Sequence, residues 1–404
     1  MRKVELLAPA GDKERLLAAL HFGADAIYFA GKKWGLRAFA ENFDEDEIKE
    51  AISLCHQNNV KAYITINVLA HNQDFEGLIE YLKYLEGCKV DGVIVNDLGI
   101  ATYVKKYTSL ELHVSTQANV TNKESALIWV SLGAKRIVLA RELSLKEIKE
   151  IKDAVGEDIE LETFIHGAMC VSYSGRCLLS NYLTGRDSNK GACAQPCRWD
   201  YAIYRKHQDD DEGDYLPIEE DERGTYILNS KDLCLVNYIK ELVEAGISSF
   251  KVEGRMKSTY YVATVINTYR RAIDDYYENK APSFNYVEEL EKTSNRAFTT
   301  GFYFGKSDNI NLISSKYKQT YDFIAVVIED SQDGYALIEH RNKFKIGDEL
   351  EVLSSTSSFN QKLILTEMLT EKKESIEEVK IVKQKVYIKT DLTLKKGDIL
   401  RKKL

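Results

Sequence analysis

The chain has 404 residues, of which 44% are hydrophobic and 29% are charged, and its formal net charge is −8. This length allows two or more domains with sizeable cores, and the composition is typical of a folded soluble protein rather than a disordered chain. The acidic balance excludes a generally basic surface for nucleic acids, so any RNA contact must use a local basic patch.

The N-terminus and the hydropathy pattern indicate a cytoplasmic protein. Met1 to Lys3 are followed directly by V-E-L-L-A-P, without the apolar run and cleavage site of a signal peptide. No apolar stretch approaches the roughly 20 residues that span a bilayer. We therefore expect no membrane partner, and we expect the thiols to stay reduced.

Apolar strands alternate with amphipathic helices along residues 1–280. The predicted strands are 4–8, 26–30, 61–68, 92–96, 111–115, 136–140, 159–165 and 249–253. Helical patterns occur at 12–22, 44–58, 73–86, 121–132, 144–154, 231–245 and 258–277. Eight strands in this alternation predict a (β/α)8 barrel of the TIM type. A doubly wound open sheet is the alternative.

Three regions fall outside this alternation. A cysteine-rich insertion near 166–229 follows strand 7, on the barrel face where loops carry catalytic groups. Residues 281–314 read as a connecting segment. Over 315–404 short strands and two similar turns, I-G-D-E-L and K-G-D-I-L, predict a small antiparallel β-barrel domain.

Polar side chains follow six predicted strands in succession, where they would gather at the barrel mouth. Four of them are predicted to be catalytic: Arg141, His166, Glu253 and Arg255. Five residues are predicted to bind substrate: Arg37, Asn67, Asn96, Gln117 and Asn119. The three arginines could hold a carboxylate by bidentate hydrogen bonds, and His166 could transfer a proton near neutral pH. The alternative is that strand ends simply emerge into water and that His166 is a structural hydrogen bonder.

Four cysteines lie within 28 residues: Cys170, Cys177, Cys193 and Cys197, with gaps of six, fifteen and three. In a reduced compartment such a cluster is more typical of metal ligands than of disulfides. A gap of six is poor for zinc and favours a cubane iron–sulfur cluster, with zinc and no metal as alternatives. Cys234, read as the start of a helix, could substitute for one ligand. A Cys170–His166 dyad of a protease is a further alternative.

The same segment resembles the peptidase U32 family. The resemblance is carried by E-T-F-I-H-G-A-M-C-V-S-Y-S-G-R-C-L-L-S at 162–180, by G-A-C-A-Q-P-C-R-W at 191–199 and by K-V-E-G-R-M-K-S at 251–258. F-G-A-D-A-I-Y at 22–28 and H-V-S-T-Q-A-N at 113–119 extend it over the barrel. The C-terminal domain is similar to the small C-terminal domain of this family.

The resemblance implies two different activities. The family name implies a collagenase-like peptidase, whereas the most similar branch implies hydroxylation of a tRNA wobble uridine to 5-hydroxyuridine, with prephenate, a small dicarboxylate metabolite, as co-substrate. In that branch the four clustered cysteines match the ligand positions of a [4Fe-4S] cluster. RNA contacts would come from lysines of the C-terminal domain. A non-catalytic partner subunit of a family paralogue is the third possibility.

Overall fold

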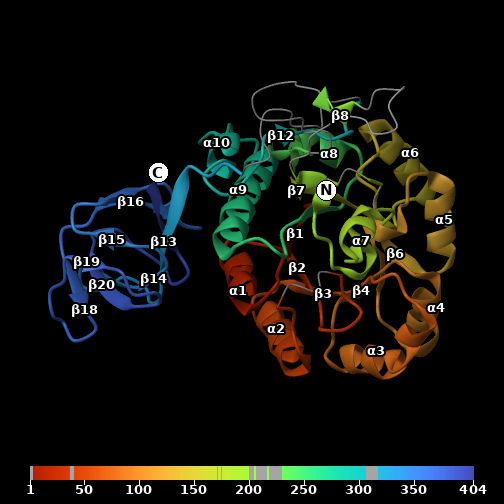
Figure 1. The fold of residues 1–404 in the computed structure, drawn as a ribbon, viewed down its shortest axis with the longest axis horizontal. Coiled ribbons are helices and arrows are strands. Elements are labelled where there is room, and N and C mark those ends of the chain that lie inside the picture. The colour runs from red at the N-terminus through yellow and green to blue at the C-terminus, as the bar shows by residue number, and fades with distance from the viewer. Residues whose placement is uncertain are drawn as a thin grey trace.

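Eight parallel strands close into a barrel in this computed structural model, which describes residues 3–36, 41–170, 172–173, 175–199, 204–205, 216–217, 230–305 and 317–404 (Figure 1). The barrel strands are β1 (Glu5–Pro9), β2 (Ala26–Phe29), β3 (Lys61–Ile66), β4 (Gly92–Val95), β5 (Leu112–Val114), β6 (Ala134–Val138), β7 (Glu160–Ala168) and β11 (Ser249–Val252). Parallel ladders of β11 with both β7 and β1 complete the ring. The predicted TIM-type barrel is confirmed, and closure of the ring excludes the open sheet.

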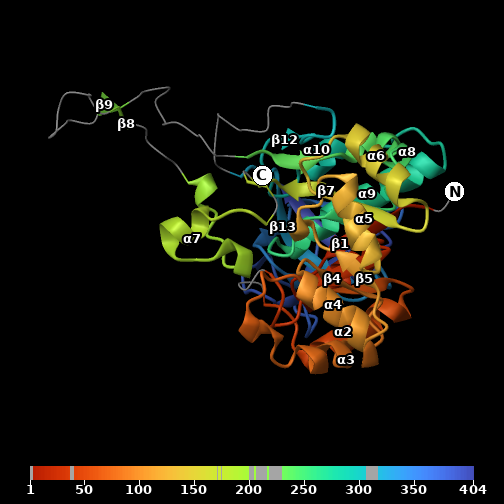
Figure 2. The same cartoon turned by 90° about the vertical axis from the view of Figure 1, so that its right-hand side faces the viewer.

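Helices surround the barrel and bury their apolar faces against the strands (Figures 1 and 2). They are α1 (Lys13–His21), α2 (Glu45–Gln57), α3 (Leu78–Gly87), α4 (Leu98–Tyr107), α5 (Lys123–Ser131), α6 (Leu145–Val155), α8 (Ile239–Glu244) and α9 (Thr259–Tyr277). Capping boxes start α2 at Asp44 and α6 at Ser144, where the side chain and the glutamate three residues later satisfy otherwise unpaired backbone N–H groups.

The predicted helix at 231–245 is wrong in its first part. Residues Asp232–Cys234 form strand β10, followed by a 3-10 turn (Val236–Tyr238) and then by α8. Strand β10 pairs antiparallel with the last three residues of β7, and β12 (Phe298–Thr299) pairs with β10. Because β7 is longer than the other barrel strands, its end offers hydrogen-bonding groups that the apolar segment around Leu233 can use.

The insertion after β7 carries short elements. Helix α7 (Leu179–Thr184) packs against two 3-10 turns, Ser188–Lys190 and Pro196–Arg198. Two short strands, β8 (Tyr204–Arg205) and β9 (Leu216–Pro217), pair with each other. Figure 2 shows α7 standing out from the barrel. The insertion is thus a separate projection on the barrel rather than part of the helical ring.

The C-terminal region is an antiparallel sheet in the order β17-β16-β21-β13-β14-β20-β18. Its strands are β13 (Tyr321–Val327), β14 (Tyr335–His340), β16 (Glu349–Leu353), β17 (Lys362–Ile364), β18 (Met368–Thr370), β20 (Lys385–Lys389) and β21 (Ile399–Lys403). Strands β15 (Phe344–Lys345) and β19 (Glu378–Val379) pair separately. The antiparallel class is confirmed. Within the described residues no ladder joins the edge strands β17 and β18, so the sheet is a half-barrel.

A buried ion pair joins the two regions. Arg401 on β21 is fully buried, and its guanidinium lies 2.6 Å from carboxylate oxygens of both Glu289 and Glu351. Glu289 belongs to α10 (Tyr286–Leu290), which packs on α9 of the barrel, whereas Glu351 belongs to β16. The half-barrel and the barrel therefore share this buried arginine, and the Lys292–Glu351 ion pair at 2.6 Å also joins them.

Candidate functional site

A pocket with an empty volume of about 490 Å³ opens at the carboxyl ends of the barrel strands. Its lining includes Tyr28, Thr65, Asn67, Ser115, Gln117, Arg141, Phe164, Lys251, Glu253 and Arg255. Five predicted site residues are among these: Asn67, Gln117, Arg141, Glu253 and Arg255. The barrel brings them together because the ends of parallel strands meet on one face.

Three cations line this pocket, against one carboxylate. Arg255 is 4% exposed and donates a hydrogen bond to Thr65 Oγ1 at 3.2 Å. Arg141 lies 4.1 Å from the centre of the Phe164 ring, and its buried Nε has no hydrogen-bond partner among the described residues. The Lys251 Nζ lies 4.3 Å from the centre of the Tyr28 ring. This arrangement suits a small molecule that carries carboxylates.

Lys251 is a pocket residue that sequence reasoning missed. It is held by Glu162, whose Oε1 accepts a hydrogen bond from Lys251 Nζ at 2.7 Å. Burial lowers the pKa of Lys251, and the Glu162 carboxylate counteracts this. The signal was in the sequence: every second residue of 249–255 is polar, and in a barrel strand alternate residues point to the axis.

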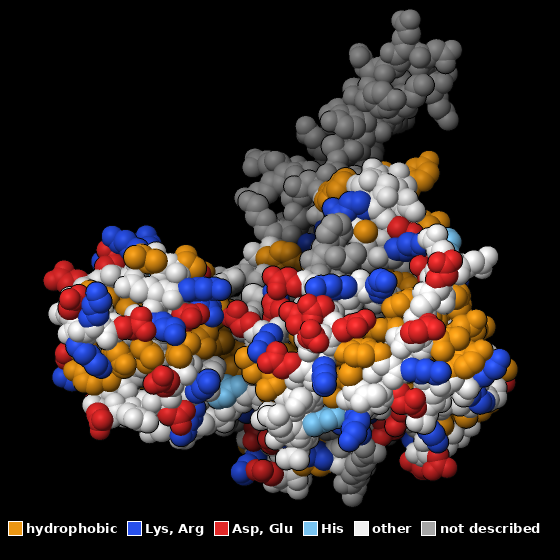
Figure 3. All heavy atoms as spheres, turned by 90° about the horizontal axis from the view of Figure 1, so that it is seen from below, with side chains coloured by type: hydrophobic (Ala, Val, Ile, Leu, Met, Phe, Trp, Pro, Cys, Tyr) orange, Lys and Arg blue, Asp and Glu red, His pale blue; other side chains and the backbone are white. Residues whose placement is uncertain are grey.

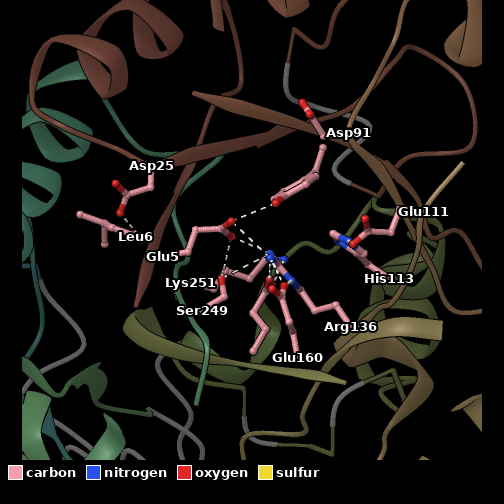
Figure 4. A network of polar contacts seen from close by, with 12 residues as sticks. Glu5, Leu6, Asp25, Asp91, Glu111, His113, Arg136, Glu160, Ser249 and Lys251 are labelled. Carbon is pink, nitrogen blue, oxygen red and sulfur yellow. Dashed lines mark hydrogen bonds and ion pairs between the residues drawn. The ribbon is translucent and has the colours of Figure 1, made fainter. Parts of the chain in front are cut away.

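Below the pocket, the barrel interior contains a buried network of charged side chains beside a small apolar cluster that includes Leu7 and Ile94. Figure 4 shows carboxylates gathered around the Arg136 guanidinium. Arg136 donates to Glu5 Oε1 at 2.6 Å, to Glu162 Oε2 at 3.1 Å and, from Nε, to Glu160 Oε2 at 2.9 Å. Burial raises the pKa of Glu162, but the charges of Lys251 and Arg136 outweigh it and hold that pKa below its usual range. The network therefore fixes Lys251 from beneath.

A second pocket lies between the barrel mouth and the insertion, with an empty volume of about 530 Å³. It shares Asn67 and Gln117 with the first pocket, and its further lining includes Asn96, Asp97, Gly175, Arg176 and Asn189. The Leu69 N–H donates to the Asn189 carbonyl oxygen at 3.2 Å, so the insertion is anchored beside the mouth. Asn119 lines a neighbouring hollow with Tyr173 and Arg176. The predicted residues thus divide between adjoining pockets.

His166 does not line either pocket, and Arg37 lies outside the described residues. The His166 ring is 2% exposed and packs among the rings of Tyr261, Tyr269 and Phe298. Burial, with a smaller contribution from the Lys257 charge, lowers the pKa of His166 to about 3. Its imidazole is therefore neutral near neutral pH and is placed away from the pocket cations.

Replacing His166 with phenylalanine is expected to weaken the acid sensitivity of folding. In the unfolded chain His166 binds a proton at an ordinary histidine pKa of about 6.5, whereas in the folded chain it is protonated only near pH 3. The free energy of unfolding therefore falls as the pH drops below about 6.5. The difference in unfolding free energy between about pH 8 and pH 5 should shrink by about 2 kcal/mol in His166→Phe, measured by urea denaturation. His71→Asn, at an exposed histidine, should keep the wild-type difference in unfolding free energy between the two pH values. The same difference in His166→Phe as in the wild type would contradict the lowered pKa of His166.

All seven cysteines of the chain, including the four clustered in the sequence, are free. Burial raises the pKa of Cys197 to about 11, Arg198 opposes this, and the thiols of Cys170, Cys193 and Cys177 raise it further, so the three thiols lie within electrostatic reach of Cys197. The Gln195 N–H donates to Cys193 Sγ at 3.3 Å. In the part of the chain that the structure describes, no three or more His, Cys, Asp or Glu side chains are arranged to hold a metal ion. Four thiols and an N–H donor nonetheless match the chemistry of an iron–sulfur ligand set.

Two arginines flank this cysteine cluster. Arg198, the residue after Cys197, donates to Gln195 Oε1 at 3.0 Å and to the Tyr317 hydroxyl at 2.8 Å. Arg296, which the sequence did not suggest, is buried; burial and the Arg198 charge lower its pKa, and the Cys197 thiol opposes this. Two cations beside the thiols would stabilise thiolate charge.

Cys234 occupies a different place from the one predicted. It lies on β10, opposite His166 in the ladder, and is 8% exposed. Burial raises its pKa to about 11, with contributions from the Val236 backbone, Tyr269 and Glu291 but from none of the four clustered thiols. Its buried position agrees with a packing role, whereas the helical assignment is wrong.

The comparisons with known proteins agree with the motif. Residues 11–312 match peptidase family U32, and residues 319–401 match the C-terminal domain of that family. tRNA hydroxylation protein P1 of Bacillus subtilis (strain 168) is 43% identical, over 87% of this chain and 83% of its own length. tRNA hydroxylation protein P of Escherichia coli (strain K12) is 33% identical, over 89% of this chain and 88% of its own length. Collagenase of Porphyromonas gingivalis (strain ATCC BAA-308 / W83) is 33% identical, over 75% of this chain and 74% of its own length.

No described helix is long and apolar enough to cross a membrane. From its sequence motifs, its two matching regions and these relatives, the chain belongs to peptidase family U32.

Proposed function

We propose that this protein hydroxylates a tRNA uridine, forming 5-hydroxyuridine at the wobble position, with a [4Fe-4S] cluster as cofactor and prephenate as co-substrate. The observation that carries the proposal is the cation-lined pocket at the barrel mouth, adjoined by an insertion with four neighbouring thiols. The names of the Bacillus and Escherichia relatives, which match most of this chain, support tRNA hydroxylation.

The insertion would supply the ligands of the cluster. Cys170, Cys177, Cys193 and Cys197 would hold it, and Arg198 and Arg296 would compensate its negative charge. When bound, such a cluster can relay electrons or act as a Lewis acid on oxygen. The N–H of Gln195 would tune the Cys193 sulfur by its hydrogen bond.

The barrel mouth would bind the dicarboxylate. Its empty volume of about 490 Å³ lies in the range of small-metabolite sites. Arg141, Arg255 and Lys251 would hold the carboxylates, whereas Asn67 and Gln117 would orient the molecule. Glu253, the one carboxylate in the lining, would accept a proton or a hydroxyl hydrogen bond.

Replacing Arg141 with methionine is expected to raise the prephenate concentration for half-maximal hydroxylation by about 10- to 150-fold, because a charge-assisted hydrogen bond contributes about 1.5–3 kcal/mol. Arg141→Lys should recover only part of the effect, since lysine lacks the planar fork. Arg341→Met, at the junction with the half-barrel, serves as the control and should leave this concentration unchanged. Equal values for Arg141→Met and wild type would show that the carboxylates bind elsewhere.

The test of the function is mass spectrometry of tRNA nucleosides. Cells that lack this gene and any family paralogue should lose 5-hydroxyuridine, and the wild-type gene should restore it. Protein purified without oxygen should contain about four iron atoms per chain. If returning the wild-type gene leaves the amount of 5-hydroxyuridine unchanged, the proposal is contradicted. A colourless protein with bound zinc would reject the redox role of the cluster.

A collagenase-like peptidase remains the second candidate, favoured by the Porphyromonas relative and by the exposed Cys170. Gelatin cleavage that survives replacement of Cys193 and Cys197 by alanine, but not of Cys170, would establish it. A non-catalytic partner subunit would instead co-purify with a family paralogue and be inactive alone.

A further inference from the structure

We propose that the insertion carries a stacking surface for the unpaired bases of an RNA loop. This insertion surface consists of Tyr173, Arg176, Tyr182, Arg186 and Trp199. The inference rests on the proposed function, because it names the part of the chain that would receive the RNA.

The first observation is an unusual exposure of aromatic side chains. Tyr182 on α7 is 90% exposed, Tyr173 is 58% exposed and Trp199 is 47% exposed. Among the described residues, these are three of six exposed aromatic side chains, gathered in one short stretch. Every base has a face that can stack on such rings, so the surface suits single-stranded nucleic acid without reading its sequence.

The second observation is the local charge. Residues 166–199 carry four arginines or lysines and a single acidic residue, Asp187, in a chain with a net charge of −8. The Arg176 side chain has no hydrogen-bond or ion-pair partner among the described residues, and Arg186 Nε donates to the Ala192 carbonyl oxygen at 3.0 Å. Aromatic rings beside cations form the usual surface for a single-stranded phosphate backbone.

The C-terminal half-barrel fits RNA less well, although its lysines were the predicted contacts. Lys362, Lys380 and Lys389 each form an ion pair with a nearby glutamate. Figure 3 shows positive and negative side chains interspersed over this region. Charges of alternating sign cancel within a Debye length, so they attract a polyanion weakly.

The third observation is the position of the surface beside the candidate site. Tyr173 lies three residues after Cys170, and Trp199 lies two residues after Cys197. Arg176 lines both the second pocket, which adjoins the barrel mouth, and the neighbouring hollow with Tyr173. Bases stacked on the insertion would therefore bring a neighbouring base to the pocket. A duplex could not do this, because its base faces are already stacked.

The test is equilibrium binding of a fluorescent RNA hairpin, with the sequence of a tRNA anticodon stem–loop, to the full chain purified without oxygen. Tyr182→Ala and Trp199→Ala should each weaken binding by about 5- to 150-fold, and Tyr182→Phe should retain it, since the ring supplies the stacking. Arg176→Gln should reduce the salt dependence of binding. A duplex of the stem alone should bind more weakly than the hairpin to the wild-type protein.

Phe304→Ala is the matched control, because Phe304 is 49% exposed but lies outside the insertion. The inference is overturned if Tyr182→Ala and Trp199→Ala bind the hairpin as the wild type does, or if the same variants lose a protein partner but not RNA. Failure of the proposed function gives a different pattern: tight, ring-dependent hairpin binding by a protein that hydroxylates no uridine.

Discussion

Replacing Arg136 with methionine is expected to destabilise the folded chain by about 3–5 kcal/mol, a large share of the total stability of a domain. Arg136 is 1% exposed and holds the carboxylates of Glu5, Glu160 and Glu162 inside the barrel. Without it, three carboxylates would share a buried space with Lys251 as the remaining cation of this network. Urea denaturation at neutral pH measures the loss.

Two variants distinguish this network from a general effect of mutation. Adding Glu160→Gln to Arg136→Met should recover part of the lost stability, because it removes one unpaired charge. The stability effects of two residues in contact are not additive. Lys13→Met, which breaks an exposed ion pair with Glu50, should cost less than about 1 kcal/mol. A loss as small as this for Arg136→Met would show that the network contributes little to stability.

Replacing Cys193 with alanine is expected to remove most of the bound iron and to lower tRNA 5-hydroxyuridine to the level of the deletion strain. A cubane cluster uses four thiolates, so loss of one ligand leaves an open iron site and a labile cluster. Iron content, the visible absorption of the anaerobic protein and nucleoside mass spectrometry measure the two effects separately.

The other cysteines supply the controls for this experiment. Cys88→Ser, at a half-buried cysteine outside the insertion, should retain iron and hydroxylation. Cys234→Ala should also retain iron, since none of the four clustered thiols affects the pKa of Cys234. Full iron content in Cys193→Ala together with loss of iron in Cys234→Ala would mean that the ligand set includes Cys234 instead.

The sequence predicted the barrel well because its signal is local. Each barrel strand is a short apolar run beside an amphipathic helix, and all eight runs form the expected strands. The segment 232–234 was assigned to a helix because an apolar run of this length fits both structures. Its strand conformation depends on the free end of β7, a partner distant in sequence.

The candidate site was partly predictable for a similar reason. Asn67, Gln117, Arg141, Glu253 and Arg255 were found because strand ends can be located from the sequence and meet on one face. Lys251 was overlooked because it lies within a strand rather than at its end. Arg296 beside Cys197 could not be found, since it is distant in sequence and only the folded chain brings it there.

The shared arginine at the junction bears on how these two regions can be separated. If the half-barrel were expressed alone, Arg401 would keep its ion pair with Glu351 but lose the one with Glu289. In the barrel expressed alone, Glu289 would keep its ion pair with Lys292 but lose the one with the Arg401 guanidinium. Either fragment would expose a polar surface normally hidden from water. A chimaera that exchanges this half-barrel between relatives should consequently be more stable if the donor brings a cation that reaches Glu289, where Lys292 is otherwise the remaining partner.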